Sequence, residues 1–240
     1  MENIPKNKIN IPMRSLMSDE IYGTIKKWIL DGTLKPGERL REMEIARQFN
    51  TSQTPVREAF KQLQKDKLLK GAAFKGVFIE EIEDIEIPEI YQLRGVLEII
   101  SLKWFILKMN EADIVKLKNI LDDMKNASLN NNIPLLVEKD ISFHGYICTV
   151  ADSKNLYPMW SLINGKASLV MAKIDIIYKI YKDINKIVGL HEEILDALEK
   201  KNKKLVMKKY KKHAEFVLKD LIKIGIINPK LEYIFDDLEL

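Results

Sequence analysis

The chain has 240 residues, of which 46% are hydrophobic and 31% are charged, a composition typical of a folded globular protein rather than a disordered one. No apolar run approaches the roughly 18 residues that a membrane span requires, and residues 1–14 lack the apolar core of a signal peptide. The single cysteine, Cys148, cannot form an internal disulfide. These features exclude membrane-spanning and disulfide-stabilised secreted proteins, so we expect a cytoplasmic protein.

Positive charge is concentrated in the first third of the chain. Residues 1–78 hold 15 Lys and Arg against 9 Asp and Glu, a balance of +6, whereas the remainder holds 24 against 26, a balance of −2. A basic front and a slightly acidic remainder are typical of a DNA-facing module joined to a second module. Chance scatter of charge in a lysine-rich chain is the alternative explanation.

The N-terminal part predicts short helices separated by turns. Residues 1–14 have two prolines and no periodicity, which indicates a loose arm. A first helix is expected from an N-cap at Ser18 to Gly32, because apolar residues recur at helical spacing and acidic residues follow the cap. A Pro-Gly turn follows at 33–38, and then a short helix over 42–49.

A second short helix and a hairpin complete this region. Thr54 is the predicted N-cap of that helix, with Pro55 at its first position, where the missing N–H costs nothing. Residues 68–81 predict two short strands around a turn. A helix pair followed by such a hairpin is the outline of a winged helix-turn-helix.

The rest of the chain predicts helices and no strand. The acidic run 80–84 marks a linker between two domains, at residues 1–80 and 81–240. The expected fold is mostly α: an N-terminal winged helix-turn-helix with a small β-hairpin wing, then a C-terminal all-α helical bundle. The expected bundle helices lie at about 85–108, 111–127, 131–151, 154–181, 183–201 and 203–224. Residues expected to pack in the core rather than line a pocket are Phe143, Tyr146, Met159 and Trp160.

Three short motifs stand in a fixed order: PGERL at 36–40, TPVREAF at 54–60 and FKG at 74–76. With these motifs and the histidine pattern below, the chain resembles the GntR superfamily of regulators, in the FadR-like subfamily with an FCD effector domain. The resemblance covers most of the chain. It implies a DNA-binding transcription regulator and no enzyme, a homodimer on a two-fold operator in double-stranded DNA, and repression more often than activation.

The resemblance also implies which residues contact DNA. They lie at the start of the second motif helix, on its outer face and in the wing: Ser52, Gln53, Thr54, Arg57, Lys61, Lys75 and Gly76. Arg57 can bind guanine or phosphate with both ends of its guanidinium. Relatives commonly have Arg where this chain has Gln53, and Gln pairs better with adenine. The alternative is that Arg57 pairs with Glu58 or Asp66 on a solvated surface.

All three histidines lie in the second domain. Asp140 and His144 are four residues apart, so they share one helix face, and His191 and His213 fall on two later helices. Three imidazoles and one carboxylate suit a divalent metal such as Zn, Ni or Mn, with the choice left open. The pattern resembles the metal site of many FCD domains. Taken singly, each histidine is better explained by a hydrogen bond, but the four together favour a metal.

Arg94 matches an inward-facing arginine of the family, which implies that it binds a small carboxylate metabolite as the effector. An ion pair with Glu98, four residues later on the same helix, is an equally good explanation. Two rival functions remain. One is a metal-dependent hydrolase, although His191 is not followed by a second histidine at HExxH spacing. The other is a regulator with a purely structural metal.

Overall fold

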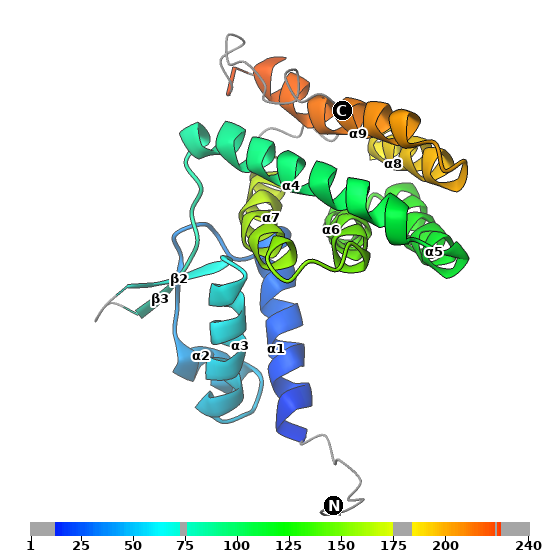
Figure 1. Cartoon of the computed structure of the whole chain (residues 1–240). Coiled ribbons are helices and arrows are strands. Elements are labelled where there is room, and N and C mark those ends of the chain that lie inside the picture. The colour runs from blue at the N-terminus through cyan, green and yellow to red at the C-terminus, as the bar shows by residue number, and fades with distance from the viewer. Residues whose placement is uncertain (1–12, 73–75, 175–183, 224, 227–240) are drawn as a thin grey trace, which may run out of the picture.

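The computed structural model (Figure 1) describes residues 13–72, 76–174, 184–223 and 225–226. The chain is mostly helical, with one small sheet near its N-terminal end. Among the described helices, none combines the length and apolarity needed to cross a bilayer. Most of the predicted N-terminal arm lies outside the described residues.

The N-terminal region is a helix-turn-helix followed by a hairpin. Its elements are α1 Met13–Leu30, β1 Arg39–Leu40, α2 Glu42–Gln48, α3 Gln53–Lys65, β2 Leu69–Ala72 and β3 Gly76–Ile79. The predicted hairpin is β2 and β3, but the sheet has a third strand and the order β1-β3-β2, all antiparallel. Strand β1 escaped prediction because two residues carry no periodicity, and it exists only by pairing with β3.

Helix α1 lies beside α3 and packs against it (Figure 1). Ile21 and Ile25, four residues apart on α1, are fully buried and belong to the same hydrophobic core as Val56 and Leu63 of α3. The apolar positions of α3 therefore face α1, and its polar positions face outward. This packing is part of one hydrophobic core that continues into the helical bundle.

Two predicted helix starts are wrong. Helix α1 begins at Met13, so Ser18 lies inside the helix and is buried instead of capping it. Helix α3 begins at Gln53 with Ser52 as its N-cap residue, so Thr54 and Pro55 are its second and third residues. Proline is tolerated there because no backbone N–H in the first turn has a partner within the helix.

The remainder of the chain is a helical bundle. After a 3-10 turn at Asp84–Glu86, its helices are α4 Ile87–Lys108, α5 Glu111–Leu129, α6 Ile133–Val150, α7 Leu156–Lys173, α8 Ile184–Glu199 and α9 Lys203–Lys223. They match the six expected helices in order, with ends shifted by a few residues. The predicted continuation of the fourth helix beyond residue 174 falls on 175–183, outside the described residues.

The four residues expected in the bundle core do not all lie there. Phe143 and Trp160 are buried, as predicted. Tyr146 is half-buried, and its hydroxyl donates to Asp113. Met159 is 59% exposed, so its predicted core position is wrong. It lies next to Trp160 on α7, and the helical turn between them directs one inward and the other outward.

Candidate functional site

A group of polar and charged side chains is buried at the centre of the bundle. It includes residues from α4, α6, α8 and α9, each less than 9% exposed: Arg94, Glu98, Asp140, His144, His191 and His213. Buried polar groups cost free energy unless they are paired. The arrangement of their partners therefore shows what the centre is built to hold.

The four predicted metal ligands come together. Asp140 and His144 lie on one face of α6, as their spacing predicts, and meet His191 from α8 and His213 from α9. One ligand atom from each residue lies within 4.8 Å of the other three. His191 Nε2 is 3.1 Å from Asp140 Oδ1 and 3.2 Å from His144 Nε2. These four residues form a cluster that could hold a metal ion.

Hydrogen bonds orient two of the imidazoles toward the cluster. His191 Nδ1 is 2.8 Å from the carbonyl oxygen of Ile187, and His144 Nδ1 is 3.0 Å from Glu98 Oε2. Each Nδ1 has an acceptor beside it, which assigns its proton there and leaves the Nε2 lone pair facing the other ring and Asp140. Acceptors this close repel one another unless a proton or a cation lies between them.

His213 supplies the remaining atom. Its Nδ1 is buried and has no hydrogen-bond partner among the described residues. Burial and the neighbouring imidazoles of His191 and His144 hold the pKa of His213 well below its ordinary value, which favours the neutral ring that binds metals. A neutral His213 ring beside three converging acceptors fits a divalent cation.

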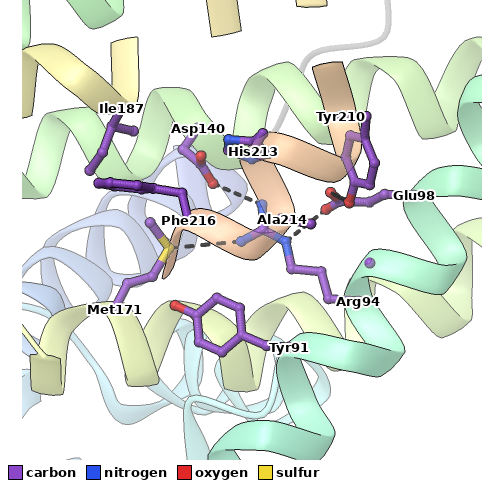
Figure 2. A pocket seen from close by; sticks show the side chains of 11 residues that line it. Tyr91, Arg94, Glu98, Asp140, Met171, Ile187, Tyr210, His213, Ala214 and Phe216 are labelled. Carbon is purple, nitrogen blue, oxygen red and sulfur yellow. Dashed lines mark hydrogen bonds and ion pairs between the residues drawn. The ribbon is translucent and has the colours of Figure 1, made fainter. Parts of the chain in front are cut away.

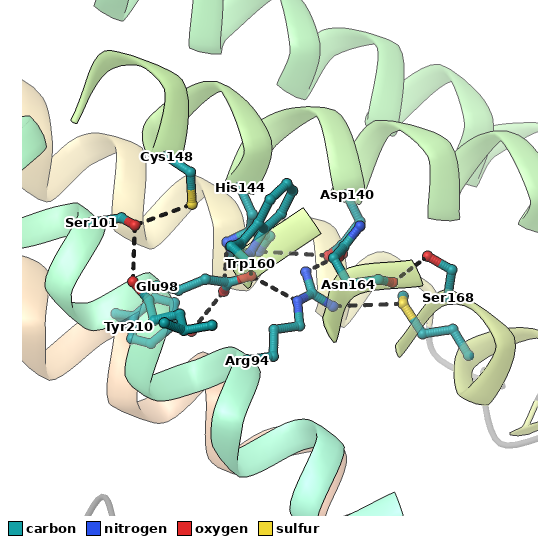
Figure 3. A network of polar contacts seen from close by, with 12 residues as sticks. Arg94, Glu98, Ser101, Asp140, His144, Cys148, Trp160, Asn164, Ser168 and Tyr210 are labelled. Carbon is teal, nitrogen blue, oxygen red and sulfur yellow. Dashed lines mark hydrogen bonds and ion pairs between the residues drawn. The ribbon is translucent and has the colours of Figure 1, made fainter. Parts of the chain in front are cut away.

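Glu98 connects the cluster to the rest of the bundle (Figure 3). Its Oε1 accepts from Arg94 Nε at 2.7 Å and Trp160 Nε1 at 2.8 Å. Its Oε2 accepts from the Tyr210 hydroxyl at 2.6 Å and faces His144 Nδ1. Burial alone would raise the pKa of this carboxyl, but Arg94 and His144 hold it below its ordinary value. No local pattern in the sequence indicates that Trp160 and Tyr210 belong to this network.

Arg94 lies between two carboxylates. It forms the ion pair with Glu98 that its spacing allows, and its Nη2 also donates to Asp140 Oδ2 at 2.8 Å. Burial opposes ionisation of Asp140, yet Arg94 holds the pKa of that carboxyl well below its usual range. The remaining nitrogen, Nη1, has one hydrogen-bond partner among the described residues, the Met171 sulfur at 3.8 Å. It is therefore the least engaged donor of the guanidinium.

A small cavity opens beside Arg94 (Figure 2). Tyr91 and Phe216 lie on its walls together with Met171 and the metal-cluster residue His213. Its volume is about 30 Å³, enough for roughly one water molecule. An organic ligand at this position must displace part of the wall.

The predicted DNA-contacting residues of α3 share its outer surface. Ser52, Gln53, Arg57 and Lys61 are exposed, and Thr54 is half-buried. They lie at the start of the helix and along the face opposite the core. The surface is basic and polar, as a duplex-binding helix requires.

Arg57 is held in place by two neighbours on this surface. Its Nε donates to Glu42 of α2 at 2.6 Å, and its Nη2 donates to Gln53 at 3.1 Å. The alternative to DNA contact was a pairing of Arg57 with Glu58 or Asp66; the acid that its Nε contacts is Glu42, which lies 15 residues away in sequence. Asp66 instead accepts from the Tyr22 hydroxyl.

The wing meets an arginine from the first strand. Gly76 has a φ of +107°, which favours glycine, and an added Cβ would lie 3.1 Å from Arg39 Nε. Arg39 is exposed and was not among the predicted DNA-contacting residues. Lys75 lies outside the described residues.

Two families match this arrangement. Bacterial regulatory proteins of the gntR family match residues 17–79, and the FCD domain matches residues 89–216, more than half of the chain. The chain belongs to the GntR family and carries an FCD domain. Members of this family are DNA-binding transcription regulators and not enzymes, so the metal-dependent hydrolase is rejected.

Curated relatives agree with the GntR assignment. The chain is 28% identical over 185 residues to the uncharacterised HTH-type transcriptional regulator YdhC of Bacillus subtilis (strain 168), covering 77% of this chain and 81% of the relative. It is 28% identical over 182 residues to the gluconate operon transcriptional repressor of the same organism, covering 75% and 74%. A probable D-xylose utilization operon transcriptional repressor of Paenarthrobacter nicotinovorans is 27% identical, covering 78% and 80%.

Solved structures share the GntR fold. McbR/YncC of E. coli superimposes with a TM-score of 0.72 at 20% identity, covering 87% of this chain and 98% of that one. A putative GntR regulator of Rhodococcus sp. RHA1 gives 0.68 at 24% identity, covering 88% and 99%. At these identities the similarity establishes the fold.

The Glu98 network yields a stability prediction. Replacing Glu98 with Gln keeps the shape but removes the buried charge and half of the acceptor sites, so Arg94 loses a partner. We expect Glu98→Gln to lower the free energy of unfolding by about 3–5 kcal/mol, measured by urea denaturation. Glu199→Gln, which breaks an exposed ion pair with Lys118, should cost less than about 1 kcal/mol. Equal losses in the two variants would contradict the account.

Proposed function

We propose that this GntR regulator is a metabolite-responsive repressor whose helical domain binds a divalent metal and a small carboxylate effector. Residues 1–80 would form the DNA-binding domain and residues 81–240 the effector domain. The observation that carries the proposal is the convergence of one ligand atom each from Asp140, His144, His191 and His213 within 4.8 Å of one another. Occupancy of the effector domain would change how two DNA-binding domains of a dimer fit their operator.

The metal would be held by Asp140, His144, His191 and His213. Three imidazoles and one carboxylate suit Zn, Ni or Mn, and these ligand types do not by themselves select among the three. The Nδ1–H groups of His191 and His144 donate hydrogen bonds to neighbouring acceptors. These bonds support the site, because a metal-binding imidazole is oriented by a hydrogen bond from its other ring nitrogen.

The charge of the centre supports an anionic effector. Glu98 and Asp140 carry two negative charges and Arg94 one positive charge, which leaves the buried centre at −1 before any metal binds. A bound divalent ion changes the balance to +1. The Nη1 of Arg94, whose one hydrogen-bond partner among the described residues is a thioether, would then donate to a carboxylate in the adjoining cavity. One relative represses a gluconate operon, and gluconate is itself a small carboxylate.

The α3 surface supports operator binding by Ser52, Gln53, Thr54, Arg57 and Lys61, with Gly76 and Lys75 in the wing. Arg57 is exposed and held by Glu42 and Gln53, so little conformational freedom remains to be lost on binding. The two hydrogen bonds would be exchanged for contacts to a base or a phosphate.

An apolar stripe on α4 supports a homodimer. Leu93, Leu97, Ile100, Trp104 and Leu107 recur at the alternating spacing of four and three residues that two packed helices share. Leu107 is 78% exposed and Trp104 40% exposed. A second copy of the chain would bury this stripe in a two-fold interface.

A regulator with a purely structural metal is the second candidate. The small cavity beside Arg94 and the two ion pairs of its guanidinium favour it. In that case the metal would raise stability, while no carboxylate would change operator affinity.

The metal proposal predicts about one divalent ion per chain in protein loaded with Zn, Ni or Mn, counted by mass spectrometry. His213→Ala should lose most of this metal, because it removes one of four ligands. The control is Glu192→Gln, at an exposed residue next to the proposed ligand His191. This change should leave the metal content unchanged. No metal in the wild type after loading would reject the metal site but not operator binding.

The DNA proposal predicts that Arg57→Ala weakens operator binding by about 5- to 150-fold, or 1–3 kcal/mol. The operator would be selected from random duplexes, and affinity would be followed by fluorescence anisotropy at fixed salt. Lys125→Ala, an exposed charge loss on α5, should have little effect. Sedimentation of the complex should give two chains per duplex. One chain per duplex would contradict the dimer, and unchanged affinity of Arg57→Ala would contradict the assigned surface.

A further inference from the structure

Helix α7 lies between the buried centre and the DNA-binding helices. In Figure 1 it crosses above α1 and α3, and it also packs against α4 and α6, which carry the polar centre. One side of α7 therefore contacts the effector site, and the other contacts the winged helix-turn-helix. A rigid helix in this position can transmit a displacement between them.

The contact with α3 is made backbone to backbone. Gly165 of α7 lies so close to Asp66 that an added Cβ would be 1.8 Å from the Asp66 carbonyl oxygen. Asp66 is the C-cap residue of α3, the helix that carries Arg57 and Lys61. Only glycine allows this approach, so the contact is specific to the position.

Asp66 is fixed to both helices of the DNA-binding domain. Its backbone N–H donates to the carbonyl of Gln62 within α3. Its side chain accepts from the Tyr22 hydroxyl of α1 at 2.6 Å, and burial together with Asp66 raises the pKa of Tyr22 above its ordinary value. A displacement of Asp66 would therefore move α1 and α3 together.

Helix α7 also contacts the polar centre through two of its side chains. Trp160 donates to Glu98, and the sulfur of Met171 accepts from Arg94 Nη1. The Trp160 ring also packs closely against Gly145 of α6, since a Cβ added at Gly145 would lie 2.9 Å from the ring. A ligand that takes Nη1 of Arg94 must displace Met171, which lies on α7.

Two lysines tie α7 to the segment between the domains. Lys166 donates to Glu86 at 2.9 Å, and Lys173 donates to the carbonyl of Ile82 and to Asp84. Beside Gly165, the buried Oδ1 of Asn164 has no hydrogen-bond partner among the described residues. A buried acceptor left unpaired on α7 destabilises the present position of the helix and lowers the cost of a change to another one.

We propose that α7 transmits the state of the metal and Arg94 site to the DNA-binding helices through the contact of Gly165 with the Asp66 carbonyl. This inference rests on the metal and effector site proposed above. It adds the route by which occupancy of that site would reach the DNA-binding helices. Gly165 acts as a positioning residue, because it contacts neither the metal cluster nor the outer face of α3.

The test compares Gly165→Ala with Gly23→Ala in the full-length protein. Both add one methyl group to a helix, but Gly23 has no atom within 4 Å of the added Cβ. Hydrogen exchange of amides 60–68 would be followed in protein stripped with EDTA and in protein loaded with zinc alone. Zinc should slow this exchange by at least about threefold in the wild type and in Gly23→Ala.

In Gly165→Ala, zinc should still bind and protect α6 and α8, while its effect on residues 60–68 is lost. Tyr22→Phe removes the bond to Asp66 without adding an atom, so it should weaken the effect in a protein with native packing. Protection of α6 and α8 by zinc with no change at 60–68 in the wild type would overturn the proposal. So would a full effect in Gly165→Ala.

If zinc binds to none of these proteins, the metal assignment fails. The contact between Gly165 and Asp66 is then tested in the absence of metal. Trp160→Phe removes the hydrogen bond between α7 and Glu98, and its exchange would be compared with the wild type in EDTA. Faster exchange at 60–68 that disappears when Gly165→Ala is also present would support the route through α7. Unchanged exchange at 60–68 in Trp160→Phe would overturn it.

Discussion

The buried Glu98 carboxylate holds together the polar centre of the FCD domain. It lies on α4 and faces donors from α4 itself, α6, α7 and α9, so one buried charge connects four helices. Each donor replaces water that the carboxylate loses on burial, and removal of any one leaves part of the charge unpaired. Stability and ligand geometry therefore share one residue, because the bond that satisfies Glu98 also fixes the ring of His144.

This sharing would let a ligand bound at the centre act on several helices at once. Arg94 is paired with Glu98 and Asp140, and it borders the cavity where a carboxylate would compete for the same guanidinium. A ligand there must rearrange partners that several helices hold in common. Since packed helices respond by shifting as units rather than by deforming, a change at the centre can reach the winged helix-turn-helix.

The bundle helices and the convergence of Asp140, His144, His191 and His213 were predicted from the sequence more completely than the contacts around them. Helical periodicity identifies α4 to α9. The four-residue spacing of Asp140 and His144 places both on one face of their helix. The partners of Glu98 could not be found this way, because Trp160 lies 62 residues away and no local pattern links them. The same holds for Glu42, which replaces nearer acids as the partner of Arg57. Tertiary packing alone brings such pairs together.

X-ray absorption at the zinc edge of zinc-loaded protein identifies the atoms that bind the ion. We expect a first shell of nitrogen and oxygen at about 2.0–2.1 Å, outer-shell scattering from about three imidazoles, and no sulfur. That result would assign the ion to Asp140 and the three histidines. A shell of oxygen alone, without imidazole scattering, would contradict the metal site and leave the buried cluster a set of hydrogen-bonded core residues.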